Sequence, residues 1–194
     1  MPDKIPIMNY RIWFKNYLRH PLQLGALFPS SSYLASLMIS HIGSDLNGKL
    51  LELGPGTGSF TRAMVDKGIP EEKLVLIEQS KDFVNLLRNS FPKANVVCGD
   101  VKELTGILNE LGIHQFDEIV SGIPLNAMSV SLRKKICREA FNLLRPGGSF
   151  VQVSYLPRCS VPADVVKSYS AKKIYCGISL RNLPPAFVWR LELQ

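Results

Sequence analysis

From residue 49 onward the sequence alternates short apolar runs with longer amphipathic stretches. The apolar runs lack the polar alternation of half-exposed strands, which is typical of parallel strands covered by helices on both faces. This pattern predicts an α/β fold with a mostly parallel seven-stranded sheet. The predicted strands are residues 49–53, 73–78, 94–100, 116–122 and 149–155, followed by 172–180 and 186–193 at an antiparallel edge.

The stretches between these strands carry apolar residues at helical spacing. Residues 1–48 precede the first strand as an N-terminal helical segment, which we assign to the same domain as the α/β part, residues 49–194. In that segment, residues 7–19 and 31–42 each have one apolar face. The other predicted helices are residues 59–67, 80–91, 101–111 and 129–144, the last ended by Arg145-Pro146-Gly147-Gly148.

Composition excludes several protein classes. With 194 residues, 46% of them hydrophobic and 20% charged, the chain can bury one core of ordinary size and is not disordered. The four cysteines are far apart and form no Cys-x-x-Cys pair, so we expect reduced thiols and no metal site. No apolar run reaches the roughly 18 residues of a membrane span. The N-terminus lacks a secretory signal pattern, and we therefore expect a cytoplasmic protein.

The glycine-rich segment Glu52-Leu53-Gly54-Pro55-Gly56-Thr57-Gly58 directly follows the first strand and opens a helix. Glycines at these positions let the backbone turn sharply and approach a ligand closely. A dinucleotide fingerprint would have glycine where Ser59 stands. The spacing is instead that of S-adenosylmethionine-dependent methyltransferases of the Rossmann-like class.

Acidic residues at the ends of the next two strands support this interpretation. Glu78 ends the second strand, where a carboxylate can accept both ribose hydroxyls. Asp100 ends the third, where a carboxylate can accept from an adenine amino group. Together with Glu52 they line the crevice at the carboxyl ends of the strands. The predicted cofactor-binding set is Glu52, Gly54, Pro55, Gly56, Gly58, Glu78, Gln79, Gly99, Asp100, Val101, Ser121 and Gly122.

The fourth strand ends in Ser121-Gly122-Ile123-Pro124-Leu125-Asn126. In amino-group methyltransferases this loop supplies backbone carbonyls that accept from the target nitrogen, and we assign that role to Ser121 and Ile123. Enzymes that act on adenine bases usually carry an aromatic ring where this chain has Leu125, to stack the flipped base. Its absence favours an amine without a π-face.

The chain resembles the bacterial phospholipid N-methyltransferases, which are related to the ribosomal RNA adenine dimethylases. The resemblance covers nearly the whole chain, and Leu125 departs from it, since relatives often have an aromatic residue there. It implies S-adenosylmethionine as cofactor and phosphatidylethanolamine as substrate, methylated toward phosphatidylcholine. The segments that carry it are His20–Ser32, Leu51–Gly58, Ser121–Pro124, Gln152–Tyr155 and Asn182–Trp189.

Further roles follow as hypotheses from this resemblance. Glu52 would bind water or the methionine ammonium of the cofactor. Tyr155 would orient or deprotonate the substrate amine, with a packed core tyrosine as the alternative. Ser30 and Ser31 are interpreted first as helix N-caps, and the same helix start would favour the lipid phosphodiester. Arg158 is the alternative phosphate contact.

Basic residues are concentrated in the two flanks of the chain. Lys and Arg outnumber Asp and Glu by four to one in residues 1–44 and by six to two in residues 158–194, whereas residues 45–157 are balanced. Such flanks suit an anionic membrane surface or nucleic acid. An aromatic face edged by cations predicts membrane contact for residues 7–19, unless that face caps the core. The contacts assigned are Tyr10, Arg11, Trp13, Phe14, Lys15 and Tyr17.

The sequence thus favours a peripheral enzyme at the cytoplasmic face of the inner membrane, with a phospholipid substrate and no nucleic-acid partner. The first alternative is an RNA or DNA adenine methyltransferase, which would need a nucleic-acid-reading appendage and an aromatic ring at Leu125. The second is a non-catalytic nucleoside-binding module at the membrane. The complete set of Glu52, Glu78 and Asp100 counts against that module.

Overall fold

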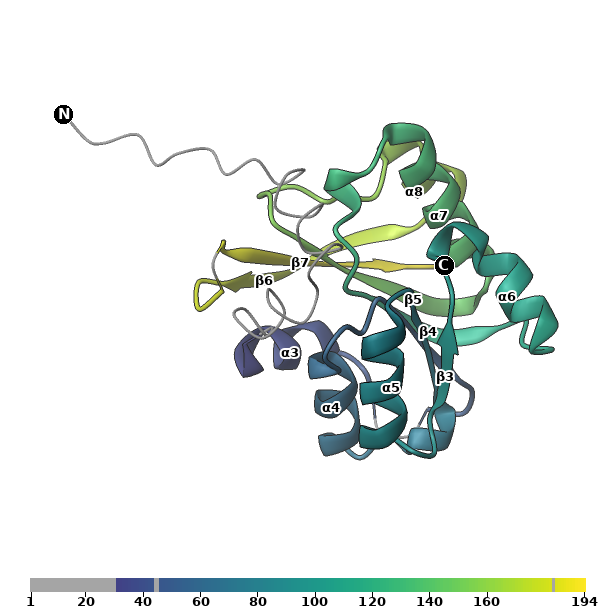
Figure 1. Cartoon of the computed structure of the whole chain (residues 1–194). Coiled ribbons are helices and arrows are strands. Elements are labelled where there is room, and N and C mark those ends of the chain that lie inside the picture. The colour runs from purple at the N-terminus through teal and green to yellow at the C-terminus, as the bar shows by residue number, and fades with distance from the viewer. Residues whose placement is uncertain (1–30, 44–45, 183) are drawn as a thin grey trace.

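The structure, a computed structural model, describes residues 31–43, 46–182 and 184–194. Its centre is one seven-stranded sheet with helices on both sides (Figure 1). The strands are β1 Leu50–Leu53, β2 Leu74–Glu78, β3 Asn95–Cys98, β4 Phe116–Ser121, β5 Leu144–Ser154, β6 Lys172–Ser179 and β7 Ala186–Glu192. The helices are α3 Ser32–Ile39, α4 Ser59–Asp66, α5 Lys81–Ser90, α6 Leu104–Glu110, α7 Val130–Asn142 and α8 Ala163–Ser168. Three 3₁₀ turns are η1 Glu71–Lys73, η2 Val101–Glu103 and η3 Leu125–Ala127.

The strand order is β3-β2-β1-β4-β5-β7-β6. Strands β1 to β5 are mutually parallel, and β7 runs antiparallel to both of its neighbours. The chain order reverses between β1 and β4, which lie side by side. Open α/β sheets bind ligands outside the carboxyl ends of the strands at such a switch point.

Successive residues of each strand point to opposite faces and build two separate cores. Helices α3, α4 and α5 cover one face, where Leu50 and Leu76 are buried with Leu34 of α3. Helices α6, α7 and α8 cover the other, where Leu51 and Ile77 are buried. Figure 1 shows the two helix groups on either side of the sheet. Burial on both faces explains why the strands are apolar throughout.

The predicted fold class is confirmed, including the antiparallel edge formed by β6 and β7. One boundary was wrong: β5 begins at Leu144 and includes Arg145–Gly148, which were predicted as a break between helix and strand. Leu144 pairs with Phe116, and the register then shifts before Ser149. Gly147 has φ +75° within this irregularity, so the extra residues are accommodated as a bulge.

The helix predicted over residues 31–42 is α3, and it packs against α4 and β6. The predicted helix at residues 7–19, with its six membrane contacts, and Ser30 lie outside the described residues. The division into residues 1–48 and 49–194 stays a prediction. Among the described helices, none is long and apolar enough to cross a membrane.

Candidate active site

The glycine-rich loop connects β1 to α4 at the switch point. Gly54 and Gly58 have φ of +68° and +82°, in the left-handed region that side chains disfavour. A Cβ on Gly54 would lie 2.7 Å from Cγ2 of Ile123, and one on Gly122 would lie 2.9 Å from the Gly54 carbonyl oxygen. The loops after β1 and β4 are therefore in direct contact, and only glycine permits this approach.

Glu52 is fully buried on β1, directly below this loop. Its Oε2 accepts a hydrogen bond of 2.6 Å from the Thr61 hydroxyl of α4, whereas its Oε1 has no partner among the described residues. The pKa of Glu52 is raised to about 8, mainly because burial disfavours the charged form. The hydrogen bond from Thr61 lowers the pKa and the nearby Glu78 raises it, and both effects are included in that value. The site therefore holds a buried carboxyl group with an acceptor oxygen left over.

Glu78 ends β2 and is also buried. Its two oxygens accept backbone N–H groups from either side, Oε2 from Gly56 and Oε1 from Ser80, each at 2.9 Å. These bonds fix the carboxylate between the glycine-rich loop and the start of α5. Each carboxylate oxygen has a second lone pair, so Glu78 retains capacity to accept hydroxyl groups.

Asp100 follows β3, and its side chain interacts with Lys102. One oxygen accepts from the Lys102 backbone N–H at 3.0 Å, and the other pairs with the Lys102 ammonium at 3.0 Å. The preceding Gly99 is held by a 2.9 Å bond from its N–H to the Glu78 carbonyl. Val101 is buried beside them and Gln79 is exposed at the end of β2. The predicted acids thus lie on or just after the adjacent strands β1, β2 and β3, and Glu52 and Glu78 are close enough to interact electrostatically.

The loop after β4 is fixed from two sides. Ser121 is fully buried, and its hydroxyl has no partner among the described residues. The Ile123 carbonyl accepts from Nε2 of Gln152 at 2.8 Å and from the Leu125 N–H at 2.9 Å. Both lone pairs of this carbonyl are therefore in use, and binding a substrate amine there would require one donor to move. Leu125 is fully buried in the core.

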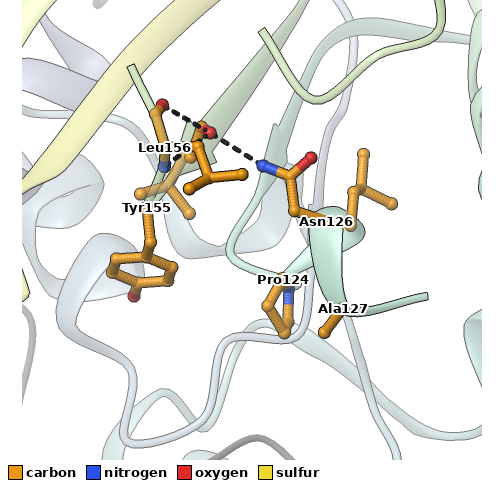
Figure 2. Close-up of a pocket in the computed structure, with 8 residues that line it drawn as sticks. Pro124, Asn126, Ala127, Tyr155 and Leu156 are labelled. Carbon is orange, nitrogen blue, oxygen red and sulfur yellow. Dashed lines mark hydrogen bonds between the residues drawn. The ribbon is translucent and has the colours of Figure 1, made fainter. Parts of the chain in front are cut away.

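A small pocket lies between this loop and the residues after β5. Figure 2 shows Tyr155 and Leu156 on one side and Pro124, Asn126 and Ala127 on the other. The Asn126 amide donates to the Ser154 hydroxyl at 3.0 Å and so joins the two sides. Tyr155 is half-buried, and desolvation by burial raises its pKa.

The two predicted phosphate contacts differ in their surroundings. Ser31 is the N-cap of α3, as predicted, and accepts from the Leu34 N–H at 3.1 Å. Its hydroxyl also donates to Asn182 at 2.6 Å, which ties the helix start to the turn after β6. Arg158 is exposed four residues beyond β5. Among the described residues, no group of three potential metal ligands occurs.

Two residues of the site were not predicted. Thr61 contacts the buried Glu52, and its position one helical turn into α4 was the only available signal. Gln152 was quoted only within a family segment, although a glutamine in an apolar strand that is buried on both faces is itself unusual.

A doubly wound sheet with a glycine-rich loop at its switch point, flanked by acids at two further strand ends, defines a Rossmann-like nucleotide-binding protein. The methyltransferase domain family matches residues 50–148. The chain belongs to the S-adenosylmethionine-dependent methyltransferases, and S-adenosylmethionine is its cofactor.

Individual relatives agree with this family. An ornithine lipid N-methyltransferase from Singulisphaera acidiphila is 33% identical over 92% of this chain and 93% of its own length. A ribosomal RNA small subunit methyltransferase A from Hydrogenobaculum is 25% identical over 59% of this chain, which spans 43% of that relative. The fold is also that of 1,6-didemethyltoxoflavin-N1-methyltransferase from Burkholderia thailandensis, solved with S-adenosylhomocysteine. That comparison has a TM-score of 0.66 at 12% identity and covers 100% of this chain and 92% of the other.

Proposed function

We propose that this protein transfers methyl groups from S-adenosylmethionine to the primary amine of a membrane lipid, phosphatidylethanolamine, at the cytoplasmic face of the inner membrane. The observation that carries the proposal is the full-length similarity to a lipid N-methyltransferase, at 33% identity over 92% of the chain. The ribosomal RNA methyltransferase relative aligns over a smaller part of both chains.

The cofactor would be held by the residues around the switch point. Glu52 has a buried acceptor oxygen without a partner, which the methionine ammonium or a water molecule would satisfy. The glycine-rich loop leaves room for the methionine part, and Glu78 retains lone pairs for the ribose hydroxyls. Asp100 would accept from adenine, in competition with Lys102. When bound, the cofactor supplies an electrophilic methyl group on a sulfonium.

The substrate amine would meet the loop after β4 and Tyr155. A primary ammonium must lose a proton before its nitrogen can attack. The raised pKa of Tyr155 keeps the phenol neutral at physiological pH, so of its two predicted roles we favour orienting the amine over deprotonating it. Most of the rate acceleration would come from holding the nitrogen, methyl and sulfonium in line.

The loop after β4 also favours an amine over a base. Leu125 stands where base-modifying enzymes place a stacking ring, and its side chain is fully buried in the core. A nucleobase would therefore find no aromatic platform at this position. The amine of an ornithine lipid is a second candidate substrate, because the relative that shares most of the chain is named for that lipid.

We assign membrane contact to the basic flanks of the chain. Lys and Arg outnumber Asp and Glu by six to two in residues 158–194, a segment that begins with the exposed Arg158. Each such cation adds about 1 kcal/mol of attraction to an anionic membrane. Residues 7–19 would add an aromatic interfacial face.

Methyl-labelled S-adenosylmethionine tests the proposal directly. The full-length protein is incubated separately with anionic vesicles containing phosphatidylethanolamine, with the same vesicles containing ornithine lipid, and with ribosomal RNA. We expect label in phosphatidylethanolamine, abolished by Glu78→Ala and retained by the exposed Glu110→Ala control. Label only in ornithine lipid would show that ornithine lipid, and not phosphatidylethanolamine, is the substrate. Label only in RNA would refute a lipid substrate.

A further inference from the structure

Gln152 is a fully buried polar residue near the carboxyl end of β5. In the sheet it lies between Ser121 of β4 and Trp189 of β7. Its neighbours on β5, Val151 and Val153, are apolar and buried. A buried amide in such a strand costs free energy unless its hydrogen bonds are made.

The amide of Gln152 binds the loop after β4. Its Nε2 donates to the Ile123 carbonyl at 2.8 Å and to the Val153 carbonyl at 2.6 Å. Rotating the amide by half a turn would place Oε1 against two carbonyl oxygens, so the assignment of nitrogen and oxygen follows from the acceptors. Gln152 therefore anchors the loop to the interior of the sheet.

The anchored residue touches the cofactor loop. A Cβ on Gly54 would lie 2.7 Å from Cγ2 of Ile123, and a Cβ on Gly122 would lie 2.9 Å from the Gly54 carbonyl oxygen. A displacement of Ile123 would consequently move the loop after β4, where we propose that the amine binds, relative to the glycine-rich loop. The positions of the substrate amine and of the cofactor would therefore both depend on the contact between Ile123 and Gly54.

Two polar atoms beside these hydrogen bonds are left unsatisfied within the described part of the chain, which costs free energy. Oε1 of Gln152 and the hydroxyl of Ser121 are buried and have no partner among the described residues. Each unsatisfied buried group costs about 1–3 kcal/mol, and an apolar residue at position 152 would avoid the cost of Oε1. What the glutamine provides over an apolar residue is therefore the pair of hydrogen bonds that fix the Ile123 and Val153 carbonyls.

We propose that Gln152 is a positioning residue for methyl transfer: its amide holds the Ile123 carbonyl and thereby sets the loop that receives the substrate amine against the cofactor loop. The inference rests on the proposed function, because it assumes that this loop receives an amine. Gln152 acts through Ile123 and need not touch either substrate.

The test compares kcat, the lipid KM and cofactor affinity in the full-length wild type, Gln152→Met and a control. Methionine keeps the side-chain length and removes both donors. We expect kcat to fall about tenfold or more, with the lipid KM and the S-adenosylhomocysteine Kd changed less than about threefold. Ser149→Ala is the matched control, since Ser149 is another buried polar residue of β5 and donates to Glu118 away from the site. It should lower stability and leave kcat unchanged.

A second variant separates positioning from general stability. In Gln152→Glu only the protonated acid has a hydrogen to donate to the Ile123 carbonyl. Its kcat relative to the wild type should therefore rise as the pH falls. If the wild type is active, a Gln152→Met kcat within about threefold of the wild-type kcat would overturn this inference and leave the proposed function intact. A ratio of Gln152→Glu kcat to wild-type kcat that does not change with pH would do the same. A wild type that labels no amino lipid would overturn the proposed function and this inference with it.

Discussion

The buried Glu52 should make the stability of the cofactor-free protein strongly dependent on pH. Its pKa is about 8 in the folded state against 4.5 for an exposed glutamate, mainly because burial penalises the charged form. Between these values the unfolded chain releases the proton and the folded protein keeps it, so folding stability falls by about 1.4 kcal/mol per pH unit. Below the unfolded-state pKa, Glu52 is protonated in both states, and above the folded-state pKa it is ionised in both. The total loss is therefore about 5 kcal/mol.

Urea unfolding of the wild type and Glu52→Gln across this pH range measures the effect. Glutamine cannot titrate, so the stability difference between the two proteins isolates the contribution of Glu52 from other groups. From about pH 5 to about pH 8 the wild type should lose roughly 3–4 kcal/mol relative to the variant. Parallel stability profiles, within about 1 kcal/mol of each other, would show that Glu52 is not buried as described.

The remaining predictions concern Thr61, which contacts that carboxyl group, and two glycines, one in the loop after β4 and one in α6. Thr61→Val removes the 2.6 Å donor to Glu52 and should cost about 1–3 kcal/mol in urea unfolding; an unchanged midpoint would contradict the bond. Gly122→Ala places a Cβ 2.9 Å from the Gly54 carbonyl and should weaken S-adenosylhomocysteine binding about tenfold or more by calorimetry. Gly106→Ala in α6 meets nothing within 4 Å, so it should raise stability by about 0.5–1 kcal/mol at unchanged affinity, and a loss would refute the open environment.

Cofactor binding should depend on the same proton. If the Glu52 carboxylate binds the methionine ammonium, S-adenosylhomocysteine affinity should rise with pH until the carboxyl group ionises, near pH 8. Glu52→Gln should bind more weakly, with a flatter profile. A wild-type affinity that does not vary over this range would contradict the assignment of the ammonium to Glu52.

The sequence was sufficient for the sheet because burial on both faces leaves continuous apolar runs. Helix α8 was not predicted, since its six residues are too few to show a helical period. The bulge at the start of β5 was also missed, because Arg-Pro-Gly-Gly is equally typical of a turn. In both cases contacts with neighbouring elements decide the local structure.

The candidate site was predictable where it depends on strand ends and less so where it depends on hydrogen-bond partners. Glu52 and Glu78 were assigned from their spacing, and the structure places them near each other, with Glu78 bonded to the glycine-rich loop. The competition between Lys102 and a ligand for Asp100 was not visible in the pattern. Nor was the bond between Gln152 and Ile123, which joins β5 to the loop after β4 across 29 residues of sequence.

Mass spectrometry of lipids from cells that express this protein tests whether it methylates phosphatidylethanolamine. The wild type should produce N-methylated phosphatidylethanolamine that is absent from cells expressing Glu78→Ala at equal protein level. An unchanged set of amino lipids, with new methyl groups on ribosomal RNA instead, would contradict a lipid substrate.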